Sequence, residues 1–247
     1  MALFEAIHLH KRFGDQVVLE DISLTFEAGQ LSGIMGPNGA GKSTCFNVLT
    51  GHYKPNAGKV MFEGKDITGL PPRVIAGMGI ARSFQLMNLF DEFTVIENIL
   101  VALPESVAKS FNIGHDIMGN SSATDRAADV LAKVGLTGRE LELAGNLPYG
   151  ERRALEIGVA LASEPRLLFL DEPTQGLGAD GTARLEELIG ELKKTYSIVI
   201  IEHDMKFLFG LADTISVIHW GQVIAQGSPD QLRDNEWVRA SKIGDAA

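Results

Sequence analysis

The chain has 247 residues, 45% of them hydrophobic, and a formal net charge of −10. This length suits one large domain or a domain with an inserted lobe, and the negative charge argues against nucleic acid as a partner, because such binding depends on clustered Lys and Arg. The single cysteine, Cys45, excludes an internal disulfide, and no Cys/His cluster has the spacing of metal ligands. No apolar run reaches the roughly 18 residues of a membrane span and the start lacks a signal pattern, so we expect a cytoplasmic protein that is free to dock on a membrane protein.

The first quarter of the chain contains two strand-like runs, VVLEDISLTF and LSGIMG, with a Gly-containing turn between them. Their β-branched residues predict strands that curl over a nucleotide site, with a helix after the glycines that follow. From about Thr94 to Leu161 the apolar spacing becomes three and four residues, which predicts a helical lobe.

After the lobe, the strand-like runs LLFLDE, SIVIIEH and TISVIHW alternate with two helix-like segments, ADGTARLEELIGELKK and DMKFLFGLA. This alternation is typical of a parallel sheet with crossover helices. The sequence therefore predicts an α/β architecture with a helical insertion.

A glycine-rich segment, GPNGAGKST, fits the phosphate-loop pattern G-x-x-x-x-G-K-[ST] and lies between a predicted strand and a predicted helix. Its backbone N–H groups and the positive end of the helix would surround a β-phosphate, with the lysine reaching the β- and γ-phosphates and the serine holding Mg²⁺. The strand and helix on either side disfavour a chance glycine turn. The residues expected to bind nucleotide here are Gly36, Pro37, Asn38, Gly39, Ala40, Gly41, Lys42, Ser43 and Thr44.

Two acids, Asp171 and Glu172, end the apolar run LLFLDE. Ligands of open α/β sheets bind at the carboxyl ends of the strands, so both acids would face the phosphates. Asp171 would hold Mg²⁺ through water, and Glu172 would polarise the attacking water. Capping of the next helix is the alternative role for these acids.

Five motifs, GPNGAGKST, RSFQ, LPYGERR, FLDEP and IIEHDM, follow one another in this order. In this order they resemble the nucleotide-binding subunit of an ATP-binding cassette (ABC) transporter, over nearly the whole chain. Within that family, the chain is most similar to subunits that drive import of branched-chain amino acids and related small molecules, through the segments FNVLTGHYKP, ARSFQ, FTVIEN, LPYGERRALEI and IEHDM together.

The resemblance implies a P-loop NTPase core with a parallel sheet, N-terminal antiparallel strands and an inserted helical lobe. Residues 1–93 and 163–247 would form the RecA-like nucleotide-binding core with its N-terminal β subdomain. Residues 94–162 would form the helical lobe that carries LPYGERR.

The resemblance also implies roles for three residues outside the phosphate loop and the acids. Phe13 matches the aromatic that stacks on adenine, and Gln85 matches the glutamine that reaches Mg²⁺ and the attacking water. His203 matches the histidine that contacts the γ-phosphate and holds the water and Glu172 in place. The segment LMNLFDEFTV matches the part that touches the membrane subunit. For these residues, a core or solvated role is the alternative.

LPYGERR departs from the family's most frequent signature, L-S-G-G-Q, because Pro148 supplies neither a hydroxyl nor an N–H. An anion would instead meet backbone N–H groups and the positive helix end. The residues expected to contact nucleotide held by a second subunit are Leu147, Tyr149, Gly150 and Glu151. The charge of Glu151 would repel a triphosphate, so we expect it to turn sideways toward one of the following arginines, Arg152 or Arg153.

A second departure lies after the two acids, where Gly178 stands in place of the aspartate of S-A-L-D and Asp180 comes two residues later. That loop normally crosses to the partner subunit. The contacts of this segment in a pair of subunits therefore stay open.

The resemblance implies an ATPase with ATP and Mg²⁺ as ligands, working as a head-to-tail pair on the inner face of the cell membrane. Its partners would be membrane permease subunits, a periplasmic binding protein, and either a second copy or a second ABC ATPase subunit. Branched-chain amino acids are the expected solute, with urea, amides and small aromatic acids as alternatives. A non-transport ABC ATPase acting on nucleic acid or the ribosome, and a regulatory nucleotide binder, are the other classes considered.

Overall fold

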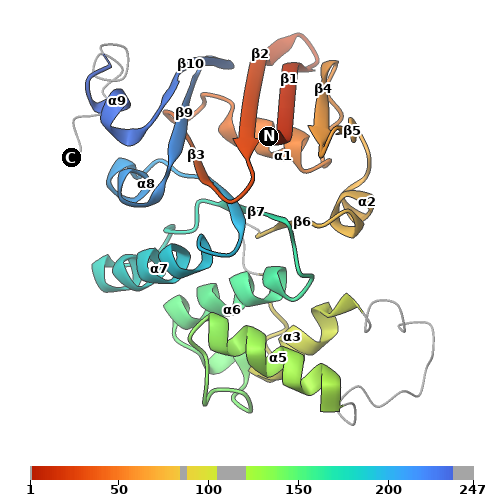
Figure 1. The fold of residues 1–247 in the computed structure, drawn as a ribbon, viewed down its shortest axis with the longest axis vertical. Coiled ribbons are helices and arrows are strands. Elements are labelled where there is room, and N and C mark those ends of the chain that lie inside the picture. The colour runs from red at the N-terminus through yellow and green to blue at the C-terminus, as the bar shows by residue number, and fades with distance from the viewer. Residues whose placement is uncertain (1, 84–87, 105–120, 236–247) are drawn as a thin grey trace.

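The computed structural model describes residues 2–83, 88–104 and 121–235. Within these ranges, ten strands form one curled sheet in the order β5-β4-β1-β2-β10-β9-β3-β8-β7-β6 (Figure 1). The strands are β1 (Ala2–Phe13), β2 (Gln16–Glu27), β3 (Leu31–Met35), β4 (Ala57–Phe62), β5 (Lys65–Asp66), β6 (Ile80–Arg82), β7 (Leu167–Asp171), β8 (Ser197–Ile201), β9 (Thr214–His219) and β10 (Gln222–Gly227). The helices are α1 (Lys42–Leu49), α2 (Pro72–Gly77), α3 (Val95–Ala102), α5 (Ser121–Lys133), α6 (Tyr149–Leu161), α7 (Ala179–Leu192), α8 (Met205–Leu211) and α9 (Pro229–Arg233), with a 3₁₀ turn at Ala144–Asn146.

The sheet has an antiparallel part and a parallel part. Strands β1, β2, β4 and β5 pair antiparallel, while β9, β3, β8, β7 and β6 pair parallel. β10 joins the two parts, because it pairs with β9 on one side and with β2 at Gln222–Asp21 on the other. This arrangement confirms the predicted α/β fold with N-terminal antiparallel strands.

The parallel strands β3, β7 and β8 are buried along their whole length, as expected for strands covered on both faces. Their alternate residues belong to two separate cores. Leu168 and Leu170 pack in a cluster with the helices that follow β6, whereas Leu167 and Phe169 pack with α1 and the antiparallel strands. The carboxyl end of β7 is therefore fixed from both sides.

Helices α3, α5 and α6 lie together below the sheet in Figure 1, away from the antiparallel strands. A capping box between Thr94 and Glu97 starts α3, because the threonine side chain accepts from the backbone N–H of Glu97 and the glutamate accepts from that of Thr94. These helices fall within the segment predicted as a lobe, and the division at residues 94 and 162 stays our prediction. No helix in the part of the chain described is long and apolar enough to cross a membrane.

Candidate nucleotide-hydrolysis site

The phosphate loop runs from the end of β3 to the first turn of α1. Two of its glycines are required by close backbone approaches. A Cβ on Gly36 would lie 2.1 Å from the carbonyl oxygen of Ile218, and one on Gly41 would lie 2.9 Å from that of Val18. Gly41 also caps α1 with a φ of 100°, a left-handed conformation that glycine adopts without strain. The tight turn before the helix thus depends on glycine at these positions.

Lys42 places a buried cation inside this loop. Lys42 is 5% exposed. Its Nζ donates to the carbonyl oxygens of Gly36 at 2.8 Å and Pro37 at 3.1 Å. Burial lowers the pKa of Lys42, and the charges of Glu172, Glu202 and Asp171 oppose that shift. Among the described residues, no carboxylate lies within 4.0 Å of Nζ to form an ion pair. A buried ammonium whose nearest partners are neutral carbonyls fits a phosphate ligand.

Asp171 ends β7 as a buried acid, 6% exposed. Burial raises its pKa to about 6, while the nearby charge of Arg82 lowers it and that of Glu172 raises it further. A divalent cation next to this carboxyl would favour its charged form. The residues described contain no cluster of three or more His, Cys, Asp or Glu that could hold a metal. A site with Asp171, the Ser43 hydroxyl and substrate phosphates fits Mg²⁺, which is usually bound by one or two carboxylates together with phosphates.

Glu172 follows directly and adopts a φ of 43°, the left-handed region that a side chain other than glycine enters at a cost. Its backbone N–H donates to the carbonyl oxygen of Ile201 at 2.8 Å, which ties it to the end of β8. Its own carbonyl oxygen accepts from Gln175 N at 3.0 Å and from Arg153 Nη2 at 2.9 Å. The backbone of Glu172 is therefore held by three separate hydrogen bonds.

His203 lies just beyond the end of β8, with its side chain 56% exposed. Nδ1 is 3.4 Å from Oε2 of Glu202, and that same oxygen accepts from the backbone N–H of His203 at 2.9 Å. The other oxygen, Oε1, accepts from the backbone N–H of Thr174 at 2.9 Å and from the Thr174 hydroxyl. Glu202 is fully buried, and it connects the segment after Glu172 to the histidine.

Sequence reasoning did not identify Glu202 or Arg82 as parts of the site. Arg82, at the end of β6, donates through Nη1 to Asn47, Thr50 and His52 at 2.8–3.1 Å, and its guanidinium lies 4.6 Å from the centre of the Phe46 ring. It thus joins β6 to the helix of the phosphate loop. The sequence signal that could have identified Arg82 and Glu202 is a charged residue at the end of an apolar strand.

Gln85 lies outside the described residues.

Phe13 lies at the end of β1 with 43% of its surface exposed. Its ring and that of Tyr53 form a T-shaped pair with 5.3 Å between centroids, and Lys11 Nζ lies 4.8 Å from the Phe13 ring centre. An exposed aromatic ring of this kind is suited to stacking on a base. Tyr53 is an aromatic neighbour that the sequence pattern did not indicate.

The signature segment begins α6. Pro148 is the residue before the helix, Leu147 is buried, and Gly150 has room beside it, because a Cβ there would meet only Leu177 at 3.9 Å. The Tyr149 hydroxyl donates to the carbonyl oxygen of Gln175 at 3.1 Å. The first turn of α6 is therefore connected to the loop that follows the two acids.

Glu151 turns aside, but not toward the residues we expected. Its Oε1 pairs with Arg139 Nη2 at 3.3 Å, whereas Arg152 pairs with Asp91 at 2.6 Å and Arg153 points into the interior. The prediction of an Arg152 or Arg153 partner was wrong, because successive residues of a helix point in different directions and cannot face each other.

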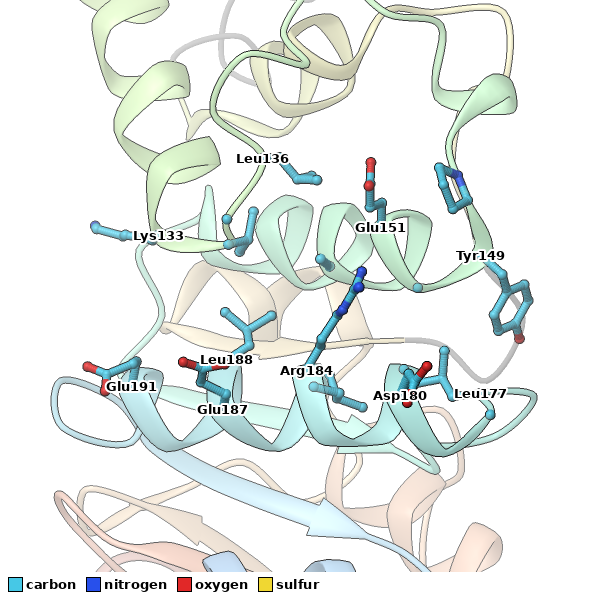
Figure 2. Close-up of a pocket in the computed structure, with 18 of the residues that line it drawn as sticks. Lys133, Leu136, Tyr149, Glu151, Leu177, Asp180, Arg184, Glu187, Leu188 and Glu191 are labelled. Carbon is cyan, nitrogen blue, oxygen red and sulfur yellow. The ribbon is translucent and has the colours of Figure 1, made fainter.

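A groove with a volume of about 590 Å³ separates the exposed sides of α6 and α7. Figure 2 shows Arg184 extending from α7 toward α6, and Tyr149 next to Leu177 at one end of the groove. Gly178 is the residue before α7, and Asp180 lies in the first turn of that helix. The two helices are thus incompletely packed on this side, next to the signature.

The model of the ABC transporter family matches residues 19–175. LivG of Escherichia coli strain K12, a high-affinity branched-chain amino acid transport ATP-binding protein, is 40% identical over 96% of both chains. BraF of Pseudomonas aeruginosa, described in the same words, is 39% identical over 99% of this chain and 98% of its own. LptB of Acidithiobacillus ferridurans, a lipopolysaccharide export ATP-binding protein, is 30% identical over 98% and 97%.

Among solved structures, the ADP conformation of MJ1267, an ATP-binding cassette of an ABC transporter, matches with a TM-score of 0.87 at 31% identity, over 99% of both chains. A nucleotide-free ATP-binding cassette matches with a TM-score of 0.85 at 30% identity, over 99% of this chain and all of the other. The fold and the ordered motifs define an ATP-binding cassette protein. The chain belongs to the ABC transporter family, which confirms the resemblance seen in the sequence.

Proposed function

We propose that this protein is the ATP-hydrolysing subunit of an ABC importer and powers uptake of branched-chain amino acids through separate membrane subunits. One observation carries the hydrolysis: Lys42 lies buried in the phosphate loop, within the electrostatic influence of Asp171, Glu172 and Glu202. A buried ammonium held by neutral carbonyl groups fits a bound phosphate, and a divalent cation would offset the negative charge of the nearby acids. The relation to LivG and BraF supports the solute.

The roles of the residues follow from their positions. Lys42 and the loop N–H groups bind the phosphates, Phe13 stacks on the adenine, and Glu172 polarises the attacking water while His203 contacts the γ-phosphate. Mg²⁺, held by Ser43, Asp171 and Gln85, supplies charge neutralisation to the phosphates. Little covalent help is needed beyond this positioning, since phosphoryl transfer depends mainly on orientation and charge.

The signature segment faces a nucleotide bound by a second subunit, so two subunits close head to tail over two ATP molecules. Gly150 and its neighbours meet that nucleotide through backbone N–H groups at the start of α6, which carries a partial positive charge. The partner is a second copy of this chain or another ABC ATPase subunit. ATP has a higher affinity for the closed pair, and hydrolysis reopens it.

An exposed aromatic pair supports docking on a membrane subunit. Phe90 and Phe93 are 56% and 39% exposed, and their rings stack at 5.0 Å between centroids. Leu143, 44% exposed, bridges to Thr94 in the same region. Such clustered apolar surface suits a protein partner. The complete system then places the protein on the inner face of the cell membrane, with permease subunits and a periplasmic binding protein.

The test combines turnover and transport. The wild-type chain and Glu172→Gln are compared for ATP hydrolysis, and then for rescue of labelled leucine uptake in cells that lack the gene. We expect the wild type to hydrolyse ATP and restore uptake, and Glu172→Gln to keep only a low residual hydrolysis rate that does not restore uptake. Equal rates for the two proteins would overturn the hydrolytic role. Restored uptake of urea or an amide without leucine would overturn the solute, and stimulation by DNA or ribosomes without permease subunits would overturn the transport role.

A further inference from the structure

Two buried charged residues on α6 have no role in the hydrolysis described above. Arg153 is 1% exposed and Glu156 is 4% exposed, and Arg153 Nη1 donates to Glu156 Oε2 at 2.5 Å, one turn along the helix. A buried guanidinium is strongly disfavoured without a counter-charge and further acceptors. The other contacts of the Arg153 guanidinium therefore indicate its role in the fold.

Two further donors of Arg153 reach the backbone next to the two acids. Nε donates to the carbonyl oxygen of Pro173 at 3.0 Å, and Nη2 donates to that of Glu172 at 2.9 Å. The rigid guanidinium plane thus spans two consecutive carbonyl groups. These carbonyls belong to the residue that carries the attacking-water carboxylate and to the residue after it.

Glu172 needs such support, because its φ of 43° is a conformation that a non-glycine residue keeps only when its surroundings fix it. The Arg153 contact acts on the carbonyl side of Glu172, while the bond from its N–H to Ile201 acts on the other side. The direction of the Glu172 side chain is set between these two contacts.

Polar contacts help to connect α6 to this segment. On the exposed side, the groove of about 590 Å³ leaves α6 and α7 incompletely packed. Toward the loop after the acids, α6 contributes the Tyr149 hydroxyl on Gln175 and the two Arg153 contacts. A small displacement of α6 is therefore passed to Glu172 directly through Arg153.

We propose that Arg153 is a positioning residue that fixes the Glu172–Pro173 backbone and so sets the direction of the Glu172 carboxylate. Because Arg153 and the signature lie on the same helix, that direction depends on the position of the signature. Glu156 neutralises the buried guanidinium and keeps it in that orientation. This inference rests on the proposed role of Glu172.

The test replaces the ion pair by apolar side chains of similar size, Arg153→Met together with Glu156→Leu. Replacement of a buried ion pair is often neutral or stabilising, but here two backbone carbonyls also lose a donor, so we expect the variant to fold with a thermal midpoint at most a few degrees below that of the wild type. Arg126→Met is the matched control, because it removes an arginine that pairs with Glu164 at 2.9 Å, away from the two acids. Arg153→Lys keeps the charge but has no planar fork to span both carbonyls.

Steady-state ATP hydrolysis by the full chain supplies the readout. In the paired variant we expect kcat to fall about ten- to a hundred-fold, the loss that misplacement of a catalytic group by about 1 Å produces. We expect the KM for ATP to stay within about two-fold of the wild type, because the phosphate loop is untouched. Arg153→Lys should lie between the two, and Arg126→Met should match the wild type.

A double-mutant cycle separates positioning through Glu172 from a general structural role. The paired change is made again in the Glu172→Gln chain, where we expect the residual rate to stay unchanged. An equal fold-loss in both backgrounds, a wild-type kcat in the paired variant, or a parallel loss of ATP affinity and thermal stability would each overturn the proposal. If instead the wild type and Glu172→Gln hydrolyse equally, the proposed function itself fails, and that comparison is made first.

Discussion

Gly150→Asp offers a test in which stability and activity are expected to move in opposite directions. Gly150 lies in the first turn of α6, and a Cβ there meets only Leu177 Cδ2 at 3.9 Å, an ordinary contact. The new side chain therefore fits the isolated subunit. A carboxylate near a helix N-terminus stabilises by about 0.3–1 kcal/mol, and loss of a helical glycine adds up to about 1 kcal/mol. The free energy of unfolding should thus rise slightly.

The same carboxylate would face the triphosphate held by the partner subunit. At about 4 Å and an effective dielectric constant of about 20, two like unit charges repel by about 4 kcal/mol. Since about 1.4 kcal/mol corresponds to a factor of ten, ATP-driven pairing should weaken by nearly a thousand-fold. Gly150→Ala adds the same Cβ without the charge and serves as the matched control.

The assays are thermal unfolding, the dependence of hydrolysis rate on ATP concentration, and light scattering of each variant with ATP in the Glu172→Gln background. We expect Gly150→Asp to unfold at or above the wild-type temperature, to lose cooperative hydrolysis and to stay monomeric with ATP. Gly150→Ala should keep both activities. Cooperative hydrolysis by Gly150→Asp at the wild-type level would refute the assignment of this segment as a nucleotide-facing signature.

Four further outcomes are expected. Pro148→Ser should be tolerated or raise turnover, measured as kcat, since it restores a hydroxyl at the start of α6. Gly36→Ala should abolish nucleotide binding in a fluorescent-ATP titration, because its Cβ would lie 2.1 Å from the Ile218 carbonyl oxygen. Cys45, whose pKa burial raises to about 12, should react with a maleimide only after denaturation. In the metal- and nucleotide-free chain, burial raises the Asp171 pKa from 3.8 to about 6. Between these two pH values the native state binds more protons than the unfolded state, so the free energy of unfolding falls as the pH rises. Asp171→Asn should therefore have a higher thermal midpoint than the wild type at pH 7, and this difference in midpoint should vanish below pH 4.

The parts of the site that the sequence predicted depend on the spacing of residues within short segments. The phosphate loop requires glycines at fixed intervals because the chain turns within a few residues, as the clash at Gly36 illustrates. Asp171 and His203 were placed correctly at strand ends because apolar runs of parallel strands bring their carboxyl ends to one edge. Both signals are contained in short stretches of sequence.

The parts that the sequence did not predict depend on contacts between distant segments. Arg139 lies twelve positions before Glu151, in the loop between α5 and the 3₁₀ turn, and nothing in the spacing indicates that the two will pair. Arg153 and Glu202 recognise backbone groups, the carbonyls of Glu172 and Pro173 and the N–H of Thr174. Backbone groups are present at every residue, so no residue pattern identifies which of them a buried side chain will meet.

The geometry of α6 bears on how the two sites of a pair would act together. Its first turn would contact the nucleotide of the partner subunit, while its inner face holds the backbone of Glu172 through Arg153. A shift of α6 caused by the partner's nucleotide would change the aim of the carboxylate in its own chain. In a pair of identical chains the same contacts are present at both sites, so each nucleotide would influence hydrolysis of the other. On this reasoning, loss of Arg153 should reduce the cooperativity of hydrolysis as well as its rate, although Arg153 contacts neither nucleotide.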